Sequence, residues 1–224
     1  MKIGLGKIVL IVALIAAVVT AAICVKVFWS AGRTLFDLLN ENRKLRQAVA
    51  NLTAESQIGY AKVLSQETRD GRLVTRVRFV ETERDEPRRI VLEKEYDIEG
   101  DVVHFDALIV KFAPQYVADG RSRALYLWRR VYGEKMKPED GLVIETPGSE
   151  LRRYSAISNA LSTRDRALFW TEIWKLSNDP QRLRDAGISA VYGNDVYQQL
   201  KPGLIYLFRI GNNGQFYLET APEM

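Results

Sequence analysis

A run of 18 uncharged, mostly apolar residues near the start of the chain, IVLIVALIAAVVTAAICV at 8–25, restricts the fold more than any other feature. About 20 such residues span the hydrocarbon core of a bilayer, and counting from Ile3, with the Lys7 ammonium extending to the interface, lengthens the run to 23. Residues 1–30 are therefore expected to form an N-terminal tail and transmembrane anchor. Its expected flanks are Lys7, Lys26 and Trp29.

A cleaved signal peptide is the alternative to a retained anchor, because the small residues at 20–22 suit a signal peptidase. Against cleavage, the apolar run continues through Ile23 and Val25, and Phe28 then begins an aromatic pair typical of a membrane interface. Lys2, Lys7 and the amino terminus favour a cytoplasmic N-terminus, although basic residues on the other side weaken this prediction. The expected location is a bacterial inner membrane, crossed once, with the C-terminal domain extracytoplasmic or periplasmic.

The basic character of the chain is confined to the anchor region. The chain carries 32 basic and 28 acidic residues, and the four basic residues among residues 1–33, where there is no acid, account for the whole excess of +4. The remainder is neutral, which argues against a nucleic-acid partner and points to the lipid bilayer.

A short heptad pattern follows the anchor and predicts a coiled-coil stalk over residues 31–56. Five of its six seam positions are apolar, and the exception, an asparagine at an a position, fixes register at a cost in stability. The seam consists of Leu35, Asn42 and Val49 at a and Leu38, Leu45 and Leu52 at d. Glu41 and Arg46 are spaced for an interhelical ion pair in a parallel homodimer or heteromer. A helix packed on its own soluble domain is the alternative, because so short a coil is marginal alone.

Residues 57–224 read as one mainly antiparallel, β-rich α+β domain with a helical insert and a C-terminal hairpin. The Asp70-Gly71 pair predicts a hairpin that leads into a strand with Arg76 and Arg78 on its wet face. An acidic strand over 90–98 is expected to pair with these arginines, and 102–112 reads as a central strand covered on both faces. Further strands are predicted at 58–64, 124–131, 203–210 and 215–220.

Helices are predicted after the proline- and glycine-rich stretch that follows these strands. Ser162 and Asp165 resemble a capping box ahead of a helix through Phe169 and Leu176. Asp179 and Pro180 start a shorter helix that stops at Gly187.

No recognisable catalytic, cofactor or metal motif is present, so a non-enzymatic protein is expected. The only cysteine, Cys24, lies in the apolar run, and a single histidine removes most zinc sites. His104 and Asp106 share a strand face and could begin a general-base pair, but no positioned nucleophile accompanies them. The triplet at 51–53 is a glycosylation sequence only in a eukaryotic secretory setting.

Two larger residue sets could form ligand sites but have simpler structural explanations. One set is aromatic and could line a groove for a sugar chain or peptide, although aromatics at such spacings are more often core residues. It consists of Tyr126, Trp128, Tyr132, Trp170, Trp174, Tyr192, Tyr197 and Tyr206. The other set consists of arginines that could bind an anion, although paired arginines are also routine at exposed strand and helix ends. Its members are Arg129, Arg130, Arg152 and Arg153.

Four segments, GDVVHFDALIVKF, LYLWRRVYGE, FWTEIWKLSNDP and VYGNDVYQQLKPGLIY, resemble an uncharacterised bacterial family of single-pass membrane proteins with a short coiled coil and a soluble α+β domain. The resemblance implies the same layout and no known activity. The anchor and the stalk LLNENRKLRQAVANL are also similar in plan to division proteins of the septum-formation-initiator type and to the rod-shape protein MreC.

The sequence therefore predicts a membrane-anchored structural or adaptor protein that associates through its stalk and presents an extracytoplasmic domain to envelope proteins. A membrane-tethered module that binds a glycan or peptide is the alternative.

Overall fold

The computed structural model describes residues 20, 26, 39–148, 151–154, 170, 173, 180–185 and 187–223. It divides the chain into two compact units, Met1–Gln47 and Ala48–Met224. Most of the predicted anchor lies outside the described residues, as do Lys7, Trp29, Leu35 and Leu38, whereas Lys26 is helical and exposed. Within the described ranges, no helix combines the length and apolar character needed to cross a membrane.

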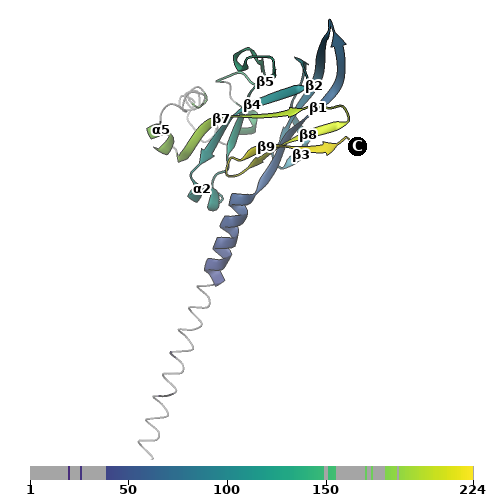
Figure 1. Ribbon diagram of the computed structural model, residues 1–224. Coiled ribbons are helices and arrows are strands. Elements are labelled where there is room, and N and C mark those ends of the chain that lie inside the picture. Colours follow the sequence, from purple (N-terminus) through teal and green to yellow (C-terminus); the bar gives the residue numbers. More distant parts are fainter. Residues whose placement is uncertain are drawn as a thin grey trace, which may run out of the picture. The chain divides into compact units, whose positions relative to one another are not determined.

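Residues 39–53 form a helix, here called the stalk helix, and the first strand begins two residues after it. The second unit contains two antiparallel sheets, drawn in Figure 1. Sheet A has the strand order β3-β2-β1-β8-β9 and sheet B the order β6-β5-β4-β7. Their strands are β1 Glu55–Arg69, β2 Arg72–Glu83, β3 Glu86–Glu99, β4 Val102–Phe112, β5 Leu125–Gly133, β6 Leu142–Val143, β7 Ile188–Gln199, β8 Leu204–Gly211 and β9 Phe216–Pro222. Short helices and 3-10 turns between them are α2 Pro114–Ala118, η1 Pro138–Asp140, η2 Arg152–Tyr154 and α5 Pro180–Asp185.

The two sheets pack face to face around one apolar core, to which seven of the strands contribute. Aromatic rings meet across the interface between the sheets. The ring centroids of Phe79 on β2 and Phe105 on β4 are 6.2 Å apart, and those of Trp128 on β5 and Phe208 on β8 are 4.8 Å apart. The architecture confirms a β-rich α+β class with few helices.

The predicted hairpin at Asp70 and Gly71 joins β1 to β2. Both residues have positive φ, 51° and 75°, as a two-residue turn of this hand requires, and Arg69 pairs with Arg72 across it. The predicted pairing of the arginine face with the acidic face is also confirmed, because Arg76 lies opposite Asp97 and Arg78 opposite Glu95.

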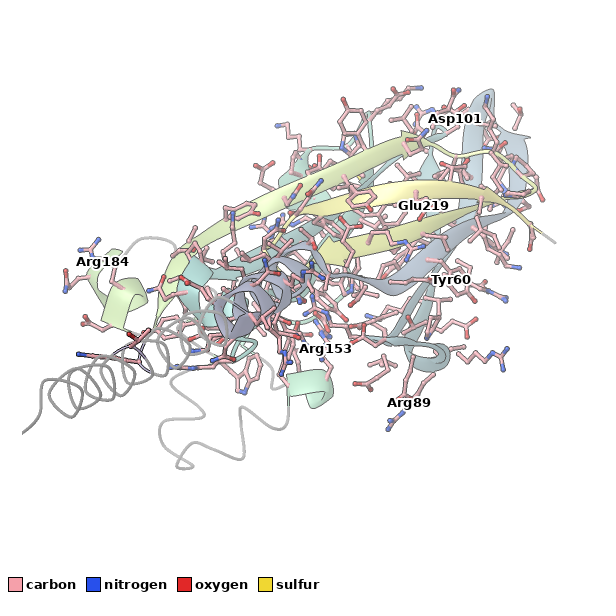
Figure 2. The ribbon with its side chains drawn as sticks, turned by 90° about the horizontal axis from the view of Figure 1, so that it is seen from below. Tyr60, Arg89, Asp101, Arg153, Arg184 and Glu219 are labelled. Carbon is pink, nitrogen blue, oxygen red and sulfur yellow. The ribbon has the colours of Figure 1, made fainter. Side chains whose placement is uncertain are left out.

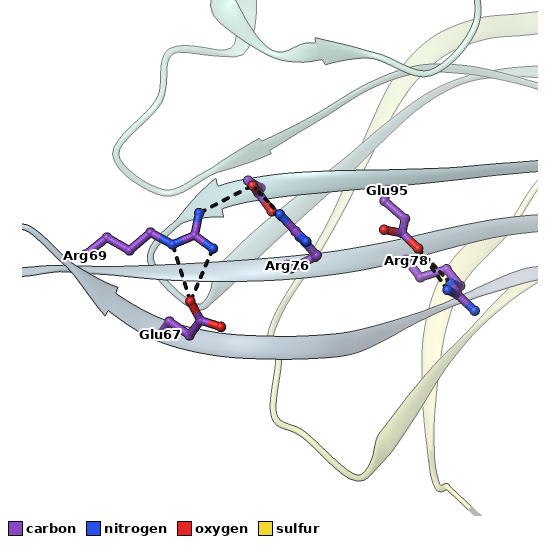
Figure 3. Close-up of polar contacts among 6 residues, drawn as sticks. Glu67, Arg69, Arg76, Arg78 and Glu95 are labelled. Atoms are coloured by element: carbon purple, nitrogen blue, oxygen red, sulfur yellow. Dashed lines mark hydrogen bonds and ion pairs between the residues drawn. The ribbon is translucent and has the colours of Figure 1, made fainter.

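These pairs make the outer face of sheet A a solvated ion-pair surface (Figure 3). Nε of Arg76 lies 2.8 Å from Asp97, and Nη2 of Arg78 lies 2.8 Å from Glu95. Arg69 lies between Glu67 and Asp97 and extends the network. Exposed pairs of this kind contribute little to stability, so this face reads as solvated surface.

The central strand was predicted correctly and one long strand was not. β4 pairs with β5 on one side and β7 on the other, and its residues 107–110 are buried. The sequence analysis assigned no element to β7, where Gly193, Asn194 and Asp195 look like a turn. Pairing with β4 along nearly the whole strand overrides that local preference.

The predicted short helix and closing hairpin are present. α5 begins at Pro180, and Gly187, with φ of 71°, follows its end. β8 and β9 pair as the predicted C-terminal hairpin. Trp170 and Ile173 are helical, but Ser162, Asp165 and Asp179 lie outside the described residues.

Candidate functional site

The outer face of sheet B is divided into a covered part and an open part. The covered part is an apolar cluster in which β4 and β5 meet Leu151, Tyr154, Trp170 and Ile173. The open part, here called the sheet B site, is built by residues of β4, β5 and β7: His104, Asp106, Arg129, Arg130, Tyr132, Asp195 and Tyr197.

One row of the site is aromatic. His104 of β4 pairs in register with Tyr132 of β5 and Tyr197 of β7, so three rings stand side by side. The His104 ring lies 4.7 Å from that of Tyr132 and 5.0 Å from that of Tyr197, stacked on both. Tyr132 is buried, whereas Tyr197 is 65% exposed. The stack therefore fixes the orientation of a ring that remains open to solvent.

The neighbouring row is charged and depends on a β-bulge. Asp106 pairs in register with Arg130 and Asp195, and the β4–β5 register shifts at this point. The shift leaves Arg129 as an extra residue, so two successive arginines reach the same carboxylate. Nη2 of Arg129 lies 2.6 Å from Oδ1 of Asp106, and Nε of Arg130 lies 3.4 Å from Oδ2 of the same carboxylate.

Gly193 provides the space that the Arg129 guanidinium occupies. A Cβ at Gly193 would overlap Nη2 of Arg129, so any larger residue must displace the side chain. Gly193 and Asp195 are two residues apart on β7 and face the same side. The glycine thus allows Arg129 to extend across the face of the sheet toward its edge strand.

His104 does not pair with Asp106, the arrangement that the sequence left open as the start of a general-base pair. Nδ1 of His104 lies 2.7 Å from Oδ2 of Asp195, while the arginines occupy Asp106. Burial, together with the negative charge of nearby Asp195, raises the pKa of Tyr132 to about 12. The sequence could not supply the true partner, because Asp195 lies on the strand that was not predicted.

Of the four arginines that the sequence offers as anion ligands, the three whose side chains the structure describes do not share one site. Arg129 and Arg130 bind Asp106, and the side chain of Arg152 lies outside the described residues. Arg153 is buried in the domain, whereas Arg89 and Arg184 project from its periphery (Figure 2).

Arg153 forms a buried ionic cluster with two glutamates. Its Nη1 lies 2.9 Å from Oε1 of Glu81, its guanidinium donates to both oxygens of Glu145, and it stacks over Tyr126 and Tyr154. Glu81 is fully buried. Burial raises the pKa of Glu81 to about 7, opposed by the attraction of Arg153 and reinforced by the charge of Glu145.

Most of the aromatic set belongs to the core. Tyr126, Trp128, Trp170 and Tyr206 are buried and cannot line an open groove, and Trp174 lies outside the described residues. Tyr197 is the member of the set that is largely exposed. No group of metal-ligating side chains was found in the part of the chain that the structure describes.

The described residues of the predicted zipper lie on the stalk helix. Asn42 is exposed, Leu45 is 60% exposed, Val49 is 59% exposed, and Leu52 is half-buried. An additional leucine, Leu39, is exposed one position after Leu38 in the heptad.

No family model matches this sequence, and neither the curated proteins nor the solved structures include a significantly similar one. The resemblance to an uncharacterised bacterial family stays a prediction.

Proposed function

We propose that the protein is a single-pass adaptor of the bacterial inner membrane that dimerises through its stalk and presents its β-rich domain outside the cytoplasm to envelope proteins. The observation that carries this proposal is the exposure of Leu45 and Val49 on the stalk helix. Apolar side chains at successive d and a positions that remain this exposed on a single chain favour a partner helix. The proposed role requires no catalytic group or cofactor.

The way the end of the helix is held supports an open seam. Nδ2 of Asn51 donates to the carbonyl of Ala118, and Nδ2 of Asn212 donates to the carbonyl of Asn51. Asn51 occupies a c position, so this contact uses a helix face other than the one that carries Val49. The alternative of a zipper packed on its own domain would require Val49 to be covered, and it is 59% exposed.

A second copy of this chain is the partner that the pattern favours. Asn42 at an a position can hydrogen-bond to its equivalent in a parallel, in-register dimer. Two chains anchored in one membrane face are held parallel and at high effective concentration, which offsets the shortness of the coil. The same seam could accept another membrane protein as a heteromer.

The test is the oligomeric state of the full-length protein with Leu45 replaced by aspartate. A charge at a d position of a short coil is expected to cost about 3 kcal/mol, or roughly a hundredfold in the dimer dissociation constant. Native mass spectrometry after mild crosslinking in the membrane should show a dimer, alone or with an envelope protein, for the parent and a monomer for Leu45→Asp.

The matched control is Ile90→Asp, which places the same charge at an exposed isoleucine of β3. It should leave the oligomer intact. If Leu45→Asp and Val49→Asp both retain the parent oligomer and its partners, the stalk is not the association surface and the proposal fails.

A further inference from the structure

We propose that the sheet B site, together with Gln199, binds an uncharged sugar chain, with the exposed ring of Tyr197 as the stacking surface. This inference concerns a different face from the stalk seam and does not depend on the dimer.

Tyr197 presents a rigid, open aromatic face. One face of its ring stacks on His104, which is held in turn by Tyr132 and by its hydrogen bond to Asp195. β7 is the edge strand of sheet B among the residues that the structure describes, so none of the described strands of that sheet lies beyond the ring. Its 65% exposure leaves room for a flat, partly apolar ligand such as a pyranose ring. A side chain that is already ordered loses little entropy when it binds.

Hydrogen-bonding groups lie on both sides of Tyr197 along β7. Asp195, Tyr197 and Gln199 alternate with inward residues, so they point to the same side, and all three are exposed. The row from Asp195 to Gln199 is about 13 Å long at the usual rise of a strand. The Gln199 amide donates to Asp101 and one oxygen of Asp195 is bonded to His104, so the row offers sugar hydroxyls the Gln199 carbonyl oxygen and the other Asp195 oxygen as acceptors. Acceptors at both ends suit a polyhydroxylated chain longer than one ring.

The charge of the site selects against ionic ligands. The two arginines at the bulge are matched by Asp106 and Asp195, so the charges of these four side chains sum to zero. Both guanidiniums already bind Asp106, whose side chain is 7% exposed, so an incoming phosphate or carboxylate would have to compete with a mostly buried partner. An uncharged ligand that hydrogen-bonds at the periphery of this pair meets no such competition.

The bulge at Arg129 and the missing side chain at Gly193 allow the guanidinium to lie across the sheet. A sugar chain that runs along β7 to Tyr197 would therefore pass over this guanidinium and Asp195.

The test is saturation-transfer difference NMR on the full-length protein in lipid nanodiscs. The probes are cellopentaose, maltopentaose and the N-acetylglucosamine pentamer, which share pyranose stacking but differ in linkage and substituents. At least one of them should bind with a dissociation constant of about 1 mM, and its ring protons should receive the strongest transfer. Tyr197→Ala should weaken that binding at least tenfold, while Tyr197→Phe should retain it.

Two variants separate this result from loss of fold or of the dimer. Tyr217→Ala removes a tyrosine from the hairpin of sheet A, where it donates to Glu55, and it should bind the sugar as the parent does. Leu45→Asp should also bind the sugar normally, even as a monomer. Equal binding by Tyr197→Ala and the parent, or no binding of any probe up to about 10 mM, would overturn the inference.

Discussion

Arg153 is buried with two carboxylates, those of Glu81 and Glu145. One positive charge cannot match two negative charges, and this imbalance determines which carboxylate takes up a proton. The Arg153 guanidinium donates to both oxygens of Glu145, whereas Glu81 lies at ion-pair distance and its oxygens accept no hydrogen bond among the described residues. Removing two carboxylates and one guanidinium from water is costly, and the attraction of one cation compensates only one anion well. Glu81 is thus the carboxylate that most readily takes up a proton, consistent with its raised pKa.

Stability is predicted to fall as pH rises from about 5 to 8 through the titration of Glu81. The folded pKa is about 7 and the ordinary value is 4.5, so the folded state holds an extra proton between these values. The extra proton stabilises the folded state fully below the unfolded pKa, and this stabilisation is lost as pH passes the folded pKa. The free energy of unfolding falls by about 3 kcal/mol in total.

Urea unfolding of the parent and of Glu81→Gln at several pH values in this range measures the effect. The glutamine stays neutral, so the difference between the two proteins should grow with pH in favour of the variant. Glu95→Gln, which alters an exposed ion pair on sheet A, should leave the parent's pH dependence unchanged. Parallel pH profiles for the parent and Glu81→Gln would show that Glu81 does not carry the effect.

At the scale of single elements, most strands were predictable because their period and turns agree with their final pairing. Asp70-Gly71 marks one hairpin, and the arginine and acidic faces of β2 and β3 identify neighbours before any contact is known. β7 was missed because three of its residues, at 193–195, favour turns, and only the strand beside it makes them extended.

The candidate site was only partly predictable for the same reason. His104, Tyr132 and Tyr197 were each noted, but the row they form requires the register of three strands. The bulge at Arg129 depends on how β5 fits against β4 and leaves no periodic signal in the sequence. The buried position of Arg153 was likewise hidden, because Arg153 lies in η2 and its partner Glu81 lies on β2, far away in the sequence.

The β1–β2 hairpin provides a test of an element. Gly71 has positive φ and no atom within 4 Å of where a Cβ would stand, so a substitution there acts through backbone conformation alone. Gly71→Val should lower the free energy of unfolding by about 1–2 kcal/mol, whereas Gly71→Asn should cost clearly less, because asparagine tolerates this conformation. Denaturant unfolding of both variants measures the difference, and equal costs would mean that the turn can change type.

At the scale of the whole molecule, the two sheets divide their outer faces by chemistry. The outer face of sheet A is a surface of exposed ion pairs. The outer face of sheet B has a covered apolar part and the open row of His104, Tyr132 and Tyr197.

The proposed orientation in the membrane can be tested with single cysteines, because the chain has only Cys24 to remove. In a Cys24→Ser background, Gln198→Cys on the exposed part of β7 should react with a membrane-impermeant maleimide in intact spheroplasts. Lys2→Cys, on the side expected to be cytoplasmic, should react only after lysis. The reverse pattern would place the domain in the cytoplasm.

The order of pairing in the two sheets also sets when the domain can fold. β1 to β3 form a local meander, but β1 needs β8 as its second neighbour, and Tyr60 pairs with Leu207. β4 likewise needs β7, so sheet B waits for residues 188–199 and sheet A for β8 and β9 at 204–222. Contacts this distant in sequence close slowly. A chain that emerges from its amino end therefore exposes the bare edges of β1 and β4 until β8 and β7 follow to pair with them.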